Sequence, residues 1–461
     1  MDLGGLTTDP TPAALPPLLS GSLGHDPVRR LCADPLGHGV ADLLGGCLPD
    51  ARSWRLELVQ SKFKPGRKLT AYYRISPAHP SGSTTDPGDD VRDRHLAVTW
   101  FADRQPSMAM APAPGGTVPP FVRSATASED GRIVLRICPD DPAMPQLSRL
   151  TDTRHLADLV DELSGRRVAA RRLSVDTLRY RPGQRHVERV RLDGEAWMYV
   201  KTDRDTSGDR AVAVATYLRG LVAEDAPQAA VAQPLGYVAG DAAALWWNVP
   251  GVPLSRRLTA GADGAVQAVA EAGRVLRVLH ESPTGPASLL AKGGPEAVRT
   301  EAHETLRAGE HVRALLPDVG RTYEQVVSDV VEALDRMPGE AEVVSHGDFK
   351  SDNLVVHDGR LTILDLDRAA WADPARDLGK FLADLRWWCP DPAVVGPLAA
   401  SFRAGYGACD EARWGRARLF ATLFRLRMTA RRLPVHDVDW TEQVRSRVGD
   451  VAEGLRAAAG A

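Results

Sequence analysis

The sequence predicts an α+β fold in which small antiparallel sheets stand beside a large helical region. Two alternating strands flank a Pro-Gly turn in residues 176–205, and a second hairpin with an Asp-Gly turn spans 354–364. Because tight turns join neighbouring strands, both hairpins must be antiparallel. Four helical segments follow the second hairpin, at 376–388, 391–407, 411–432 and 440–458.

The composition indicates a protein that works in water and holds two or three compact units. The chain has 461 residues and a formal net charge of −3, which gives it no general attraction for nucleic acid or an anionic membrane. Its five cysteines are scattered without a CxxC pair, as in reduced cytoplasmic proteins. No apolar run approaches the roughly eighteen residues that a membrane helix needs. We therefore expect a cytoplasmic protein without nucleic-acid or membrane partners, in an oligomeric state that the sequence leaves open.

The first 170 residues contain an echo of the segment that follows them. "KFKPGRKLTAYYRIS" at 62–76 matches "RYRPGQRHVERVRLD" at 179–193 with a constant offset of 117 residues. Each copy follows a helical stretch rich in leucine and aspartate. We predict that residues 1–170 form an extra α+β domain, a decayed copy of the next unit, in which Thr99 stands where the second copy has Lys201. Chance similarity between two hairpins is the alternative.

The second copy joins a turn at 182–185 to a strand that carries a lysine. Residues 196–202, "AWMYVKT", are an apolar strand with Lys201 near its end. The turn has a single glycine, and its backbone N–H groups could face an anion. Taken alone this is an ordinary hairpin, but ahead of a strand lysine it is a candidate phosphate site.

The stretch "HGDFKSDNLVVHDGRLTILDLD", residues 346–367, concentrates acids around an apolar hairpin. Its Asp-Gly pair at 358–359 is a strong two-residue turn signal, because both central residues of a type I′ turn need positive φ. Pairing the strands from that turn places Asn353 opposite Leu364 and next to Asp365. Two oxygen ligands at one open end suit Mg²⁺, which takes one or two protein groups together with phosphate and water.

Together these motifs resemble a known family. "HGDFKSDN", "TILDLD" and "DPARDL" are similar to the HGD-x-x-x-x-N and hydrophobic-Asp-x-Asp signatures of the aminoglycoside phosphotransferase/choline kinase-like group, which has a protein-kinase-like fold. The resemblance covers roughly residues 172–410. It implies a bilobal molecule, with a nucleotide-binding small antiparallel β lobe at 171–250 and a mainly helical large lobe at 251–461 that holds the catalytic loop and the metal site.

The resemblance also implies roles for single residues. In the catalytic loop, Asp348 would be the catalytic base, Lys350 would meet the γ-phosphate and His346 would support the loop, while Asp377 would be structural. Three residues would serve the metal ion: Asn353, Asp365 and Asp367, the last as a second ligand or merely exposed. In the small lobe Lys201 would bridge the α- and β-phosphates. The remaining nucleotide contacts would come from the turn (Pro182, Gly183, Arg185) and from the hinge "ALWWNVPGVPL" at 244–254 (Trp247, Val249).

The function implied by the resemblance is ATP-dependent, Mg²⁺-assisted phosphorylation of a hydroxyl group of a small molecule, with GTP not excluded as the nucleotide. One departure leaves an alternative open: the helix after Lys201 has no glutamate in the place where kinases hold that lysine. A nucleotide-binding regulatory pseudokinase is therefore one rival. A kinase for Ser or Thr of a peptide is the other, because Lys350 is typical of protein kinases. The arginine-rich segment at 411–432 predicts a neutral or anionic acceptor.

Overall fold

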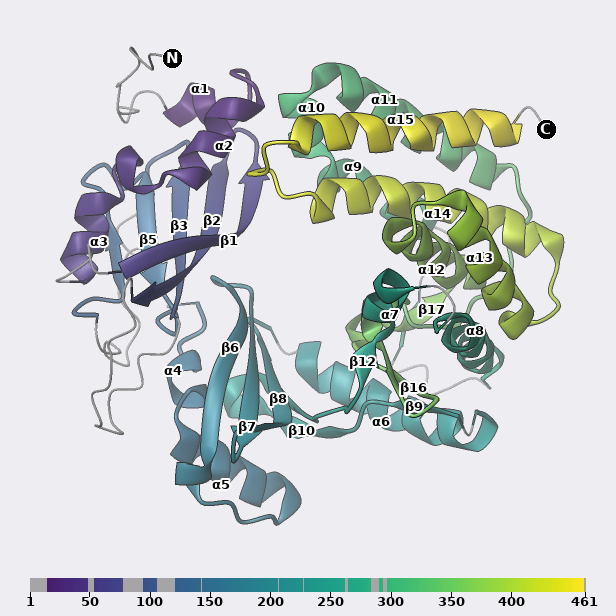
Figure 1. The fold of residues 1–461 in the computed structure, drawn as a ribbon, viewed down its shortest axis with the longest axis horizontal. Coiled ribbons are helices and arrows are strands. Elements are labelled where there is room, and N and C mark those ends of the chain that lie inside the picture. Colours follow the sequence, from purple (N-terminus) through teal and green to yellow (C-terminus); the bar gives the residue numbers. More distant parts are fainter. Residues whose placement is uncertain are drawn as a thin grey trace.

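The computed structural model describes residues 15–48, 54–77, 94–105, 121–141, 143–205, 207–226, 228–261, 264–282, 290–292 and 297–459. This part of the chain is α+β, as predicted. It forms three packed regions: a first sheet with its helices, a second sheet with its helices, and a helical region that holds two small sheets (Figure 1).

The first region is an antiparallel sheet with helices on one face. Its strands are β1 (Trp54–Lys64), β2 (Lys68–Pro77), β3 (Arg94–Phe101), β4 (Ala125–Ala127) and β5 (Ile133–Ile137), in the order β1-β2-β3-β5-β4. The helices are α1 (Leu15–Ser20), α2 (His25–Ala33), η2 (Leu36–His38) and α3 (Ala41–Cys47). Leu69, Tyr73 and Trp100 are buried on the helix side, and the Tyr73 hydroxyl donates to the carbonyl of Cys32 on α2 (2.7 Å). The alternate residues, which include Lys62 and Thr70, lie on the opposite face.

The second region has the same plan. Its strands are β6 (Leu173–Arg181), β7 (Arg185–Leu192), β8 (Glu195–Asp203), β10 (Pro234–Val238) and β11 (Ala243–Trp247), in the order β6-β7-β8-β11-β10. The other elements are α4 (Leu147–Leu150), α5 (Thr153–Ser164), η5 (Ala170–Arg172), α6 (Ser207–Asp225) and η6 (Ala239–Asp241). Leu156 and Val160 of α5 share a buried core with Val175 of β6. By packing, α5 therefore belongs with the second sheet, although the sequence grouped it with the first 170 residues.

The two sheets agree in detail as well as in strand order. In both, a Pro-Gly turn with a left-handed glycine closes the first hairpin, with φ values of 67° and 62°. Thr99 pairs with Thr70 in the first sheet, and Lys201 pairs with Val187 in the second. Val187 is the residue 117 positions after Thr70, so Thr99 occupies the place of the lysine. The two sheets thus share strand order, turn and register, and their origin by duplication stays a prediction.

The third region is mainly helical. Three of its helices begin after an aspartate: the side chains of Asp373, Asp391 and Asp410 each accept a hydrogen bond from a backbone N–H of the first turn. The predicted helices after the second hairpin are confirmed within two residues at each end. The helices are α7 (Leu254–Ala260), α8 (Val266–Glu281), α9 (Ala297–Ala308), α10 (Glu310–Leu315), α11 (Pro317–Asp335), α12 (Pro374–Trp388), α13 (Pro392–Tyr406), α14 (Glu411–Arg432) and α15 (Trp440–Ala459).

Two small sheets sit among these helices. One has the order β12-β15-β16-β9 and contains β12 (Val252–Pro253), β15 (Leu354–His357), β16 (Arg360–Ile363) and β9 (Ala229–Val231). The other has the order β13-β17-β14 and contains β13 (Ala291–Lys292), β17 (Ala370–Ala372) and β14 (Val343–Ser345). Two short 3-10 turns, η7 (Ser351–Asn353) and η8 (Leu366–Arg368), flank the β15–β16 hairpin.

The first region also packs on the C-terminal part of the chain, so that α2 and α15 lie close together (Figure 1). The His25 ring stacks on Trp440 with 4.8 Å between the ring centroids, and its Nε2 lies 2.7 Å from the carbonyl oxygen of Val435. Ser61 on β1 pairs with His436 (2.8 Å). In the described part of the chain no helix is both long and apolar enough to span a bilayer.

Candidate active site

The β15–β16 hairpin has the register that the sequence predicts. His357 pairs with Arg360 across a turn whose two central residues have φ values of 45° and 75°. The ladder continues to a hydrogen bond from the Leu364 N–H to the Asn353 carbonyl (2.8 Å). Asn353 and Asp365 therefore emerge at the same open end of the hairpin.

Asp377 and His346 fix the loop that precedes this hairpin. The buried Asp377 carboxylate accepts hydrogen bonds from the backbone N–H groups of His346 (2.6 Å) and Gly347 (2.9 Å). The His346 ring is buried, and its Nε2 contacts the Leu364 carbonyl (2.9 Å) while its Nδ1 accepts from the Asp348 N–H (3.3 Å). Since both ring nitrogens are engaged, the His346 ring ties the loop to the hairpin.

Only glycine fits at position 347 of this loop. Its φ is 78°, and a Cβ there would lie 2.1 Å from the carbonyl oxygen of Arg368. The catalytic loop and η8 thus meet backbone to backbone.

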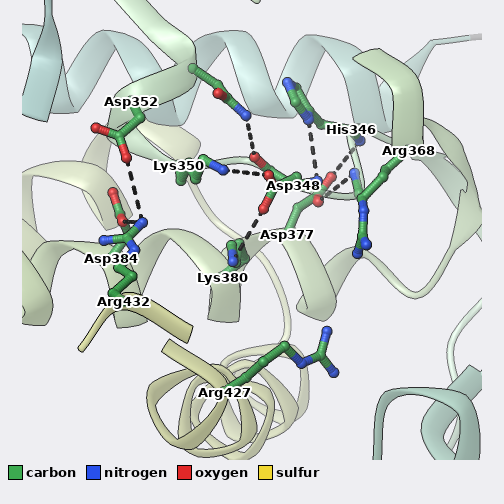
Figure 2. Close-up of polar contacts among 12 residues, drawn as sticks. His346, Asp348, Lys350, Asp352, Arg368, Asp377, Lys380, Asp384, Arg427 and Arg432 are labelled. Atoms are coloured by element: carbon green, nitrogen blue, oxygen red, sulfur yellow. Dashed lines mark hydrogen bonds and ion pairs between the residues drawn. The ribbon is translucent and has the colours of Figure 1, made fainter. Parts of the chain in front are cut away.

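Two lysines hold the Asp348 carboxylate between them. Lys350 Nζ lies 2.5 Å from Oδ2, and Lys380 Nζ lies 3.1 Å from Oδ1 (Figure 2). Burial would raise the pKa of Asp348, but Lys380 and Lys350 outweigh it and hold that pKa well below its ordinary value. Asp348 is therefore ionised at neutral pH and carries the negative charge that a proton acceptor needs.

One stripe of α12 supports the whole loop. Asp377, Lys380 and Asp384 lie three and four residues apart, on one face of the helix. Asp384 is fully buried and accepts hydrogen bonds from the N–H (2.8 Å) and the hydroxyl of Ser351, and it pairs with Arg432 of α14 (2.7 Å). The sequence argument missed Lys380 and Asp384. Their spacing from Asp377 was the available signal, because residues three, four and seven apart share a helical face.

Lys201 pairs with two carboxylates at the end of the β15–β16 hairpin. This hairpin is called the metal hairpin below, because Asn353 and Asp365 at its open end are the candidate metal ligands. Its Nζ lies 2.8 Å from Asp365 Oδ1 and also pairs with Asp367. Arg185 joins the same group, with its guanidinium 2.6 Å from Asp203 and 3.2 Å from Asp367. The acids that replace the missing helix glutamate thus come from a segment 164 and 166 residues away in sequence.

The two carboxylates beside Lys201 have opposite pKa shifts. Burial would raise the pKa of Asp365, but Lys201 overrides it and lowers that pKa to about 2. Burial and the neighbouring charge of Asp365 raise the pKa of Asp367. Asp365 also has left-handed backbone angles (φ 60°, ψ 63°), which are uncommon for a residue with a side chain and recur at functional sites.

The donor set fits a magnesium ion. Asn353 donates through Nδ2 to the Asp348 carbonyl (3.0 Å), which leaves its side-chain oxygen as an acceptor at the hairpin end where Asp365 also emerges. In the described residues no group of three or more His, Cys, Asp or Glu could hold a metal ion. Mg²⁺ needs no such cage, because nucleotide phosphates and water fill most of its six positions. Asp367 fits less well, since Lys201 and Arg185 already neutralise it.

The turn at 182–185 does not offer N–H groups in the predicted way. Pro182 has none, the Gly183 N–H donates to Asp141 (2.5 Å), and the Gln184 N–H closes the turn on Arg181 (3.0 Å). Asp141 precedes the second sheet in sequence and clamps the turn from outside. The cations on the strands, of which Arg185 reaches the metal hairpin, therefore remain as the candidate phosphate contacts of this hairpin.

The predicted hinge lies between the two lobes, but the Trp247 side chain faces away from Lys201. Trp246 pairs with Tyr199 on the face that carries Lys201, whereas the Trp247 ring packs against Trp197 on the other face, with ring centroids 5.4 Å apart. Any contact of Trp247 with a nucleotide must use its backbone. Val249 follows in the linker and has no backbone hydrogen bond within the described chain.

Four of the seven arginines of helix α14 are ion-paired within the described residues. Arg413 and Arg416 pair with Glu340, Arg427 pairs with Glu301, and Arg432 pairs with Asp384. The helix is therefore tied into the large lobe by ion pairs, and it does not by itself indicate the charge of the acceptor.

Comparison with known proteins gives one family. A model of the phosphotransferase enzyme family (APH) matches residues 112–420, more than half of the chain, from the first sheet to α14. No curated protein matches the chain. Similar solved structures include the GDP and kanamycin complex of APH(2")-IIia (14% identity, TM-score 0.47, covering 65% of this chain and 99% of that one). Another is a choline/ethanolamine kinase family protein from Mesorhizobium loti (17%, TM-score 0.46, 66% and 95%). A third is the amicoumacin kinase hAmiN with AMP-PNP, Ca²⁺ and Ami (13%, TM-score 0.44, 60% and 88%).

Proposed function

The chain belongs to the phosphotransferase enzyme family with its protein-kinase-like fold, and on that premise we propose that it transfers the γ-phosphoryl group of ATP to a hydroxyl group of a small molecule. One observation carries the proposal. The ionised Asp348, the oxygen ligands Asn353 and Asp365, and the strand lysine Lys201 converge from three elements on one place. Phosphoryl transfer needs a proton acceptor, metal ligands and a phosphate-binding cation in that arrangement.

In the proposed reaction the acceptor oxygen forms a bond to the γ-phosphorus while the bond from that phosphorus to the bridging oxygen of ADP breaks. The hydroxyl proton passes to the Asp348 carboxylate. Lys201 holds the α- and β-phosphates, and Lys350 meets the γ-phosphate. Asn353 and Asp365 would hold Mg²⁺, which neutralises phosphate charge when it is bound.

The ion pairs of this structure suit an enzyme before nucleotide binding. Lys201 pairs with Asp365 and Asp367, and Lys350 pairs with Asp348. Phosphates draw both lysines away, because they offer more negative charge than a carboxylate. Asp365 is then free for the metal ion, and the pKa of Asp348 rises towards a value at which it can accept a proton.

The carboxylates beside Lys201 weaken the pseudokinase alternative. That alternative rests on the missing helix glutamate, but Asp365 and Asp367 hold Lys201 at the metal hairpin without it. We propose therefore that the chain is catalytic, and that the lysine exchanges these carboxylates for phosphates as the nucleotide binds.

A product screen tests the proposal. The full-length protein is incubated with ATP or GTP, Mg²⁺ and pools of metabolite alcohols and Ser/Thr peptides, and mass spectrometry identifies phosphorylated products. Asp348→Asn is the matched control, since it keeps the shape of the side chain and removes its charge. We expect a phosphorylated alcohol with the native protein only. A phosphopeptide as the sole product would favour the peptide kinase, and nucleotide binding without any phosphorylated product would favour the pseudokinase.

A further inference from the structure

Lysine is rare in this chain, and its distribution is uneven. Only seven of the 57 lysines and arginines are lysines. Three of them, Lys201, Lys350 and Lys380, contact the carboxylates of the candidate active site. Three others, Lys62, Lys64 and Lys68, line one pocket on the first sheet. A compact ammonium group with rotatable donors suits phosphate groups. We therefore ask whether the second lysine cluster, like the first, binds phosphate.

The pocket lies between the first sheet and the turn of the second. It is small, with a volume of about 30 Å³, it is partly open to solvent, and the turn contributes Pro182 and Gln184 to its wall. The remaining lining residues come from β1, β2 and β3: Lys62, Lys64, Lys68, Thr70, Tyr72 and Thr99. They share one face of the sheet, because Lys62 pairs with Thr70, Lys64 with Lys68, and Thr70 with Thr99.

This face corresponds to the nucleotide side of the second sheet. With the offset of 117 residues, Lys62, Lys64 and Lys68 match Arg179, Arg181 and Arg185. The cross-strand pairs agree: Lys64 pairs with Lys68 in the first sheet, and Arg181 pairs with Arg185 in the second. Lys201 and Arg185 lie on this face of the second sheet and reach the metal hairpin. The first sheet has lost that lysine to Thr99, but it has kept cations at all three other positions.

Several cations around the pocket have no ion-pair partner among the described residues, although Glu310, which pairs with Arg67, acts on Lys64. Within the described residues, no carboxylate lies within ion-pair distance of six cations: Lys62, Lys64, Lys68, Arg179, Arg181 and Arg431. Like charges directly across a strand pair, as in Lys64 and Lys68, are destabilising. Lys62 is exposed, whereas Lys64 and Lys68 are half-buried. Desolvation at the sheet face and repulsion from neighbouring cations, first Lys64 and then Arg181, lower the pKa of Lys62 to about 8.

The basic surface continues towards the active site. Arg181 and Arg431 of α14 both act on Lys62, so the pocket is within electrostatic reach of the second sheet and of the large lobe. Burial and Arg185 lower the pKa of Arg179, whereas Asp365 raises it. Arg179 therefore interacts electrostatically both with Asp365 of the metal hairpin and with the strand cation Arg185. A chain of positive charge thus runs from the pocket to the place where phosphoryl transfer is proposed.

We propose that the pocket formed by Lys62, Lys64 and Lys68 is a second anion site, which binds a phosphate or similar multiply charged group of the acceptor while the nucleotide occupies the neighbouring sheet. The assignment of the anion to the acceptor rests on the proposed phosphotransferase function; the binding of an anion does not. The acceptor is then an alcohol that already carries a phosphate-like group at some distance from the hydroxyl to be phosphorylated.

Lysine footprinting tests the site without reference to activity. The full-length protein, saturated with AMP-PNP and Mg²⁺, is treated at pH 8 with a limiting amount of an amine-acetylating reagent, with and without inorganic pyrophosphate, and each lysine is quantified by mass spectrometry. We expect pyrophosphate to reduce labelling of Lys62, Lys64 and Lys68 at least fivefold and to leave the labelling of Lys380, which contacts Asp348 and not the pocket, unchanged. Equal labelling with and without pyrophosphate would overturn the site.

A charge-matched pair of variants adds a binding measurement. Lys62→Gln/Lys64→Gln should weaken pyrophosphate binding to the nucleotide-saturated protein at least tenfold in calorimetry. Arg55→Gln/Arg171→Gln removes the same charge from exposed positions outside the pocket and should weaken it less than twofold. Equal losses in both variants would mean that only general charge attracts the anion, and would overturn the site.

The acceptor assignment is tested with alcohols and their monophosphates as paired substrates. We expect kcat/KM to be at least tenfold higher for the phosphorylated member, and the Lys62→Gln/Lys64→Gln variant to lose that preference through the KM of the acceptor. Lysine protection without such a preference would overturn the acceptor assignment. Phosphorylation of neutral alcohols without protection would refute the anion site and leave the phosphotransferase proposal standing. Lysine protection without phosphorylation of any alcohol would support the anion site and refute the phosphotransferase proposal.

Discussion

The buried ion pair between Lys380 and Asp348 should control the pH at which the enzyme begins to work. Lys380→Met keeps the length and the apolar stem of the side chain and removes its charge. At 3.1 Å and an effective dielectric constant near 20, the pair has a gross attraction of about 5 kcal/mol. Lys350 stays at 2.5 Å and continues to favour the ionised form of Asp348. The net effect is therefore smaller, and opposite charges at this range move a carboxyl pKa by roughly one to three units.

The sign of the change follows from the direction of the native shift. The pKa of Asp348 is lowered in the folded protein, so its ionised form stabilises the fold above the unfolded value near 3.8, and that stabilisation is lost as the pH falls through the folded pKa. In Lys380→Met the folded pKa moves upward. The acid limb of the pH–rate profile should then rise by roughly one to two pH units, equivalent to about 1.4–2.7 kcal/mol.

The assay is the pH dependence of kcat/KM from the lowest pH at which both variants remain folded, near pH 2.5, to pH 8, with the acceptor found in the product screen and unfolding midpoints recorded at each pH. Arg386→Met is the control, because Arg386 lies on the same helix and has no ion pair in the described chain. The reasoning is refuted if the acid limb of Lys380→Met stays in place, or if the control moves it equally.

Three further predictions concern the proposed base, the metal ligands and a buried acid. Asp348→Ala should lower turnover by at least 10²–10⁴-fold with nucleotide affinity nearly intact in calorimetry; near-native turnover in a folded variant would remove Asp348 from the role of base. Asn353→Ala and Asp365→Ala should both weaken Mg²⁺-dependent nucleotide binding, Asp365→Ala more strongly because it loses a formal charge, and equal binding with and without Mg²⁺ in the native protein would contradict this. Glu188 on β7 is fully buried, no hydrogen bond from the described residues reaches its carboxylate, and His186 Nδ1 lies 3.6 Å away; burial raises its pKa from 4.5 to about 8. The free energy of unfolding that Glu188 takes from the protein therefore grows as the pH rises from 4.5 to 8. Glu188→Gln should raise the free energy of denaturant unfolding by roughly 2–4 kcal/mol at pH 7 to 8 and by much less at pH 5. A gain independent of pH would show that Glu188 is not protonated in the fold.

The sequence by itself determined the features that local geometry dictates. A two-residue Asp-Gly turn permits few registers, so the positions of Asn353 and Asp365 at one end of the hairpin followed from counting residues. The helices after the hairpin followed from their apolar period. The structure adds that Asp373, Asp391 and Asp410 satisfy the first N–H groups of three of them locally. The spacing from Asp348 to Asn353 and the strand context of Lys201 led to the family, which the match over residues 112–420 confirms.

Only the tertiary structure decided which distant groups form ion pairs and hydrogen bonds with each other. Lys380 reaches Asp348 because α12 packs under the loop, and Asp141 takes the Gly183 N–H because the preceding segment folds over the turn. No local pattern predicts such contacts, since they depend on how whole elements pack. The same holds for the arginines of α14, which find acids on other elements, and for the lysine pocket. Its three lysines stand close together in the sequence of one hairpin. Their contact with the turn of the second sheet, more than a hundred residues later, depends on how the two sheets pack against each other.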